Sequence, residues 1–204
     1  RWLELFKSKP GLRVQALGTD MDGASRLICR FLRPQQPPEH IDREDPFSIE
    51  AAARYVSLIP FLGDMEIFGL SDLWCSDQEF LNIRCGDWEE HAVLLCNYFN
   101  YIDRYRKEKV PGYGDNNIQS YVMLCDILPE GEAAMVLRRD HQTLHCEFWH
   151  PITGDCYFVP HRPAPERRLC GRRKRQAAQP TQPGQPSSPV QAKDLRATPL
   201  IPIQ

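Results

Sequence analysis

The segment Cys85–Cys96 resembles a helix start that a thiol enzyme would use, but without the thiol. Asp87 is a favourable N-cap and Glu90 follows three residues later, so the two can form a capping box that satisfies unpaired backbone N–H groups. Those N–H groups and the helix dipole would favour the thiolate of a cysteine at the first helical position. Trp88 occupies that position, and an indole neither ionises nor attacks a carbonyl carbon. We therefore expect a helix that packs well but carries no nucleophile.

Two neighbours of Trp88 are further candidates for chemistry. Cys85 lies three residues earlier, where it would serve a thiol hydrolase or transferase with a shifted nucleophile. A packed loop cysteine is the favoured interpretation, because no histidine is expected at a matching position on the strands. His91 lies one turn into the helix, and we expect a hydrogen-bonded structural residue there instead of a general base.

Five histidine and cysteine residues near the end of the apolar region suggest a metal site at first sight: His141, His145, Cys146, His150 and Cys156. The spacing of the first two suits a helix, but turns and strands are expected here. Adjacent residues of a strand point to opposite faces, so His145 and Cys146 cannot easily bind one ion. We expect no metal ion and no cofactor.

The helices that would position these residues are visible as apolar stripes and end signals. Residues 23–33 have helical spacing, Asp45-Pro46 marks a second helix start, and Ser76 with Glu79 forms a second capping box. The central helix from Asp87 has a stripe made of Trp88, Ala92, Leu95, Phe99 and Ile102.

Strands follow the helices. Residues 105–117 are charged and rich in Gly and Asn, which indicates an exposed loop. Four short strands are predicted after it: Tyr121–Ile127, Ala133–Arg138, Leu144–Trp149 and Cys156–Val159. Helices first and an antiparallel meander afterwards is the pattern of an α+β fold.

Composition divides the chain into three parts. Residues 161–204 hold nine Lys and Arg against two acids, although the whole chain has a net charge of −2. We predict a remnant of a preceding region over 1–18, one domain over 19–162 and a basic, Pro/Gln-rich disordered tail over 163–204. The first residue is Arg1, so we expect a piece of a larger protein. No apolar run is long enough for a transmembrane segment.

The basic run and the eight cysteines carry weaker information. The run Arg172–Arg175 suits nuclear import, an anionic membrane, an acidic partner or nucleic acid equally well. Nucleic acid is disfavoured, because the tail lacks spaced aromatic residues for base stacking. Cys29, Cys96 and Cys146 lie in apolar segments, as buried free thiols do, so a reduced intracellular protein is favoured over a disulfide framework.

The segment Gly86–Ala92, Gly-Asp-Trp-Glu-Glu-His-Ala, resembles the Gly-Asp-Cys-Glu-Asp-His-Ala segment of the transglutaminase-like domain in ciliary and centrosomal proteins. The resemblance is strongest to the coiled-coil and C2 domain-containing proteins of the ciliary transition zone. Further matching stretches, in the same order, are Ser57–Phe61, Ser71–Trp74, Asp77–Leu81, Glu90–Phe99 and Leu128–Gly131. Together they extend over roughly residues 25 to 160. The resemblance implies a papain-like or transglutaminase-like core, with N-terminal helices and a central helix packed on a small antiparallel sheet.

The resemblance also implies where a catalytic triad would stand. The cysteine falls on Trp88, the strand histidine on or near Ala133, and the turn aspartate on His150. All three residues depart from the family pattern, so we expect no covalent catalysis.

An inactive cleft would leave an apolar groove for a protein partner. We expect Trp88, His91 and Trp149 to line that groove, with Trp88 as the anchor. The partners implied are other proteins of a ciliary transition-zone complex, and no small-molecule substrate is expected. The implied location is cytoplasmic, at the base of the cilium, in a scaffold involved in cilium assembly.

Overall fold

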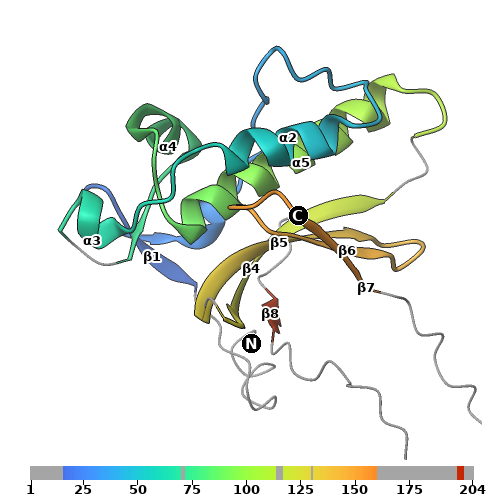
Figure 1. Cartoon of the computed structure of the whole chain (residues 1–204). Helices are drawn as coiled ribbons and strands as arrows, with labels where there is room; N and C mark the ends of the chain where they lie inside the picture. The colour runs from blue at the N-terminus through green and yellow to red at the C-terminus, as the bar shows by residue number, and fades with distance from the viewer. Residues whose placement is uncertain (1–15, 70–71, 114–116, 130, 160–196, 200–204) are drawn as a thin grey trace, which may run out of the picture.

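The computed structural model describes residues 16–69, 72–113, 117–129, 131–159 and 197–199 (Figure 1). One long helix lies over one face of an antiparallel sheet with a shorter helix packed along it, and two further short helices and a second small sheet lie at one end of the long helix. The predicted α+β class and the central helix packed on an antiparallel sheet are both confirmed.

The central helix is α5 (Trp88–Lys109), and it begins where the capping box predicts. The Asp87 carboxylate accepts the N–H of Glu89 at 3.1 Å, and the Glu90 carboxylate accepts the N–H of Asp87 at 3.1 Å. Together they satisfy two of the backbone donors that a helix start leaves unpaired.

The helix extends further than its apolar stripe predicts. Residues 105–109, assigned above to a loop, form its last turn. Arg106 is buried there, and its guanidinium donates to the carbonyl oxygens of Arg43 and Asp45. This part of the helix is therefore held by polar contacts with a distant segment, which a search for apolar periodicity does not detect.

Three shorter helices accompany α5: α2 (Ser48–Ser57), α3 (Asp64–Ile67) and α4 (Asp77–Ile83). The helix predicted from Asp45-Pro46 is α2, which packs along α5 through a buried stripe of Ile49, Ala52, Ala53 and Val56. The capping box predicted for the short helix is present in α4, where Ser76 and Glu79 exchange hydrogen bonds.

The larger sheet has the strand order β7-β6-β5-β4-β8, and all its neighbours are antiparallel. Its four main strands are the four predicted ones: β4 (Ile118–Ile127), β5 (Gly131–Asp140), β6 (Cys146–Trp149) and β7 (Cys156–Val159). Val122 of β4 lies opposite Val136 of β5, and both belong to the core that includes α5.

The fifth strand comes from the segment predicted to be disordered. Residues Ala197–Pro199 form β8, which pairs with β4 at Met123–Cys125. The rest of the predicted tail, including the basic run Arg172–Arg175, lies outside the described residues, as do residues 1–15 of the predicted N-terminal remnant.

The helix predicted over residues 23–33 is wrong. This stretch contains β2 (Ser25–Leu27) and a short 3₁₀ turn, η1 (Ile28–Arg30), and β2 pairs with β1 (Leu17–Asp20). The Asp20 carboxylate accepts the N–H groups of residues 22 and 24 and the Arg26 guanidinium. With Gly23 at φ 77°, these bonds build a tight turn that competes successfully with the helical spacing. A third strand, β3 (Leu73–Trp74), runs parallel to β1.

A buried ion network joins α5 to the sheet. The Arg138 guanidinium of β5 donates to Asp103 of α5 at 2.8 Å and to Glu147 of β6 at 3.2 Å. The Asp103 and Arg138 side chains are only 6% and 11% exposed. Removing one partner of such a pair leaves a buried charge unpaired.

We predict that Arg138→Met destabilises the fold by about 3–5 kcal/mol, because Asp103 loses its cation in a poorly hydrated site. Urea unfolding followed by circular dichroism measures this change. Arg104→Met is the matched control, since the Arg104–Glu108 pair is largely exposed and should contribute less than about 1 kcal/mol. Equal effects of the two substitutions would contradict the prediction.

Candidate functional site

Trp88 is the first residue of α5 and lies half-buried between two other rings. Phe61 contacts it edge-on at 5.9 Å between ring centroids, and His150 contacts it edge-on at 5.0 Å. Edge-to-face contacts at these distances are favourable. The indole therefore fills the position at the helix start with packing contacts on two sides.

The connection between α2 and α3 (residues 58–63) lies along the entry to α5. Leu62 donates its N–H to the carbonyl oxygen of Gly86, and Gly86 donates to Pro60. A side chain at Gly86 would come within 2.7 Å of the Phe80 ring, so glycine permits this close approach. The Gly-Asp-Trp order thus has a local physical basis in addition to its resemblance to an enzyme motif.

The structure brings together two of the three positions implied for a triad. Trp88 and His150 are in ring contact, as described above. Ala133 lies in β5 opposite Cys125, next to Ala134, which belongs to the core against α5. Because side chains alternate along a strand, Ala133 points to the other face of the sheet.

His150 organises a turn between β6 and β7. Its N–H donates to the carbonyl oxygen of Asp155, its carbonyl accepts from Gly154, and its Nδ1 accepts the N–H of Thr153 at 3.2 Å. The residue is buried and combines these bonds with its contact to Trp88.

His91 is completely buried. Its Nδ1 lies 2.6 Å from the carbonyl oxygen of Asp87, and its Nε2 lies 3.1 Å from that of Ile59. Burial lowers the pKa of His91, although these two carbonyl contacts act in the opposite direction. The ring ties the first turn of α5 to the connection over residues 58–63, which is the structural role expected for it.

Two of the three residues expected to line a groove are too deeply buried to do so. His91 is 0% exposed and Trp149 is 5% exposed, so neither presents a surface to a partner. Trp149 packs edge-on against Phe99 at 5.3 Å and donates its indole N–H to Glu147. The sequence identified these residues as apolar or aromatic but did not reveal how deeply they are buried.

A cavity of about 300 Å³ lies elsewhere, between α5 and β4. It is lined by residues of both elements, including Asn97, Asn100 and Ser120. The Asn100 amide accepts the N–H of Ser120 and donates to its carbonyl oxygen, as a neighbouring strand would. The cavity is thus separate from the surroundings of Trp88, and no motif in the sequence marks it.

Several of the described cysteines are buried or half-buried thiols whose pKa is raised. Cys85 has a weak contact from its Sγ to the carbonyl oxygen of Ile83 at 3.9 Å. Burial raises the pKa of Cys75 to about 12 and that of Cys125 to about 11. Cys29, expected to be buried, is exposed because its segment forms the 3₁₀ turn η1 and not a helix.

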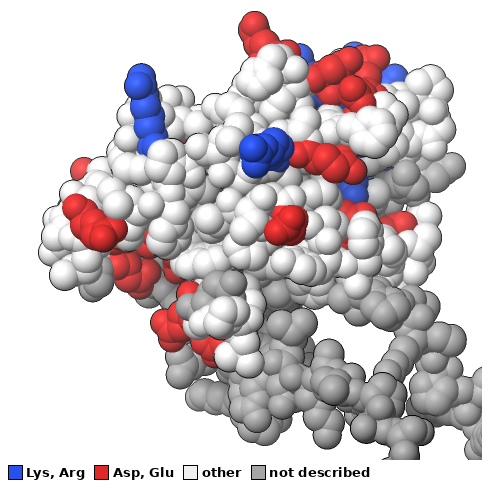
Figure 2. Space-filling model, in the orientation of Figure 1, with Lys and Arg blue, Asp and Glu red and all other residues white. Residues whose placement is uncertain are grey.

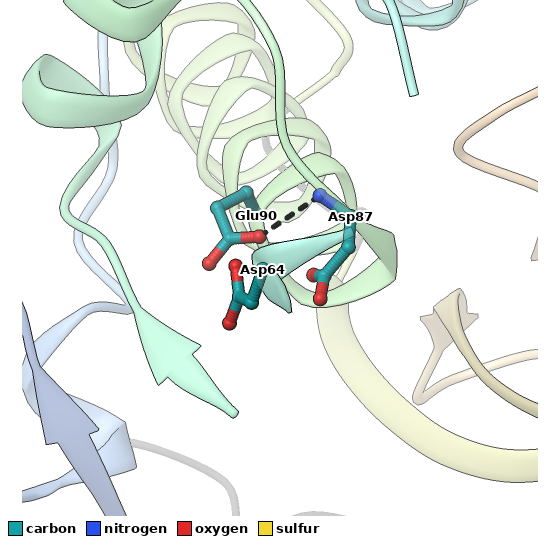
Figure 3. A group of neighbouring side chains, drawn as sticks. All are labelled: Asp64, Asp87 and Glu90. Carbon is teal, nitrogen blue, oxygen red and sulfur yellow. Dashed lines mark hydrogen bonds between the residues drawn. The ribbon is translucent and has the colours of Figure 1, made fainter. Parts of the chain in front are cut away.

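The histidine and cysteine residues weighed as metal ligands are not gathered around one point. Among the described residues, the group that could hold an ion is instead Asp64, Asp87 and Glu90, at the start of α5 (Figure 3). Asp87 and Glu90 are visible in the sequence as the capping box. Asp64 is brought to them only by the packing of α3, and no local signal marks it.

Comparison with known proteins defines the class of this domain. The model of the CEP76 peptidase-like domain family matches residues 72–172. Human protein CC2D2B is 29% identical over 154 residues, covering 72% of this chain and 10% of the relative. Coiled-coil and C2 domain-containing protein 2A of Drosophila melanogaster is 24% identical over 168 residues, covering 82% of this chain and 12% of the relative. Human centrosomal protein of 76 kDa is 28% identical over 104 residues, covering 47% of this chain and 15% of the relative.

The match over residues 72–172 is to a peptidase-like domain. The chain is similar to the CC2D2 proteins and to centrosomal protein of 76 kDa, which confirms the resemblance found in the sequence. It spans about a tenth of the length of the CC2D2 relatives. Within the described residues, no helix has the length and apolar character to span a bilayer.

We predict that no described cysteine reacts unusually fast with iodoacetamide at pH 7, because thiolate formation needs a lowered pKa and burial raises it at Cys75, Cys125 and Cys156. Mass spectrometry of tryptic peptides after timed labelling measures each site. Cys29, which is free and exposed, serves as the internal reference. A Cys85 rate ten or more times that of Cys29 would contradict the prediction.

Proposed function

We propose that this chain is a non-catalytic protein-interaction domain with a transglutaminase-like core, acting as a scaffold in a ciliary transition-zone assembly. The observation that carries the proposal is Trp88 at the start of α5, packed against Phe61 and His150. A covalent mechanism needs a nucleophile and a base in hydrogen-bond contact. An indole between two rings supplies neither.

The surface beside Trp88 supports an interaction role. Four side chains of residues 58–65 are exposed although they are large and apolar: Leu58, Phe61, Leu62 and Met65. Phe61 is 47% exposed while it packs on Trp88, so it continues the buried aromatic cluster out to the surface. Apolar side chains that gather in this way are typical of protein-binding surfaces. The surface over residues 58–65 therefore replaces the groove expected from the sequence, with Trp88 as its support.

The occupant best suited to this surface is an apolar segment of another protein. Aromatic residues at the centre of an interface commonly contribute most of its binding energy. One relative is named as a coiled-coil and C2 domain-containing protein and another as a centrosomal protein. These names support a partner within a ciliary transition-zone assembly.

We predict that Phe61→Ala and Trp88→Ala each weaken recruitment of transition-zone proteins at least tenfold, because truncating a central aromatic anchor costs about 2 kcal/mol or more. Co-precipitation from ciliated cells with the full-length tagged protein, followed by titration with the recovered partner, measures the loss. Phe47→Ala is the matched control, since Phe47 is 70% exposed at the N-terminus of α2, outside this surface. Unchanged binding in a well-folded Phe61→Ala protein would argue against the surface.

The location proposed for the full-length protein has its own test. Fluorescence microscopy of the tagged protein in ciliated cells should show it at the base of the cilium, beside a transition-zone marker. A uniform cytoplasmic signal would reject the ciliary part of the proposal and leave the non-catalytic part intact.

The competing function is a thiol hydrolase or transferase that uses Cys85. The position of Cys85 near the helix start is the observation that favours it. The Cys85 sulfur contacts a carbonyl oxygen, and such a contact does not activate a thiol. Loss of a measurable peptidase or transglutaminase activity in Cys85→Ala would establish this function and overturn ours.

A further inference from the structure

Three carboxylates meet where α3 faces the start of α5 (Figure 3). Asp64 is the first residue of α3, Asp87 caps α5, and Glu90 lies in the first turn of α5. One oxygen atom from each of the three lies within 4.8 Å of the other two. Asp64 and Glu90 are each only 4% exposed, so bulk water solvates neither of them well.

Asp64 distinguishes this cluster from an ordinary capping network. Its Oδ2 accepts the N–H of Leu73, whereas its Oδ1 is buried with no hydrogen-bond partner among the described residues. Figure 3 shows an oxygen atom of this carboxylate pointing toward the carboxylate of Glu90. A buried acceptor left without a donor costs free energy, so this oxygen atom is suited to a ligand that supplies a proton or a positive charge.

The charges around the cluster are also negative. The carboxylates of Asp87 and Asp72 are both close enough to Asp64 to repel a negative charge on it. Asp87 and Asp64 act in the same way on Glu90. Figure 2 shows further acidic side chains gathered toward the α3 end of the molecule. Close carboxylates in a poorly hydrated site require either a shared proton or a cation.

We propose that Asp64, Asp87 and Glu90 bind one divalent cation, and that Ca²⁺ is the ion that fits them. Calcium binds oxygen ligands at 2.3–2.6 Å, so two ligands on opposite sides of it are about 5 Å apart. Three ligand atoms within 4.8 Å of one another can therefore contact one such ion. Magnesium needs shorter bonds and near-ideal octahedral geometry, which makes it the weaker candidate.

Such an ion would join α3 directly to the start of α5. That junction also holds the connection over residues 58–63, through the His91 contact with Ile59 and the Leu62 bond to Gly86. Calcium would consequently stabilise the segment that carries the exposed apolar surface. The binding of the ion itself is independent of the proposed partner and is tested without one.

The test is a calcium titration of the metal-free chain by isothermal calorimetry, together with its melting temperature with and without CaCl₂. We expect one site per chain, a higher melting temperature with Ca²⁺ and a smaller rise with Mg²⁺. Asp64→Asn keeps an acceptor for Leu73 but removes the charge, and should weaken binding by about tenfold or more. Glu108→Gln is the control, because that exposed carboxylate lies in the last turns of α5 and should leave binding unchanged.

Terbium luminescence gives a second readout on the unmodified chain, since Trp88 adjoins Asp87 and Trp74 adjoins Leu73. Ca²⁺ should displace Tb³⁺ that is excited through these indoles, so the proposal stays testable even if Asp64→Asn does not fold. No binding at millimolar Ca²⁺ would overturn the proposal, as would equal binding by wild type and Asp64→Asn. A higher melting temperature of Asp64→Asn that CaCl₂ does not change would also overturn it, by showing that a shared proton neutralises the cluster.

Discussion

The start of α5 is the junction on which the rest of this structure depends. The capping box of Asp87 and Glu90 closes the helix end, and the same Glu90 also accepts the N–H of Cys75 beside β3. His91 reaches from the first turn to Ile59 in the connection between α2 and α3. One turn of helix thereby joins segments that are 15 and 32 residues away in the sequence. Because these bonds are buried, they hold the surrounding segments in place with little competition from water.

The same junction differs from the helix start of a thiol enzyme at the position of the nucleophile. A helix start with unpaired N–H groups favours negative charge, and thiol enzymes use that property to stabilise a thiolate. In this chain carboxylates take up those N–H groups, while Trp88 turns its ring toward Phe61 and His150. The electrostatic property of the helix end thus remains, but it acts on carboxylates in place of a nucleophile. This arrangement joins the proposed interaction surface and the proposed ion site within a few residues of each other.

Much of the framework was predictable because its signals are local. The capping boxes at Ser76 and Asp87 mark helix starts through contacts within four residues, and both helices begin there. The four strands from β4 to β7 follow from short apolar runs between turns. The failures have physical causes as well. The helix predicted over residues 23–33 does not form, because the Asp20 carboxylate stabilises a turn in spite of the helical spacing of the apolar residues. The end of α5 was predicted too early, because Arg106 is held by the carbonyl groups of residues 43 and 45.

The amino-acid sequence alone was enough to predict where the central helix begins, that its first residue is Trp88, and that a meander of strands follows. These properties depend on residue type and on neighbours along the chain. The three-dimensional packing was needed to show that His91 and Trp149 are buried, that Trp88 contacts His150, and that Asp64 lies beside the carboxylates of the helix start. Each of these contacts joins residues that are distant in sequence. Their geometry follows from how whole helices and strands pack, and no local pattern encodes that packing.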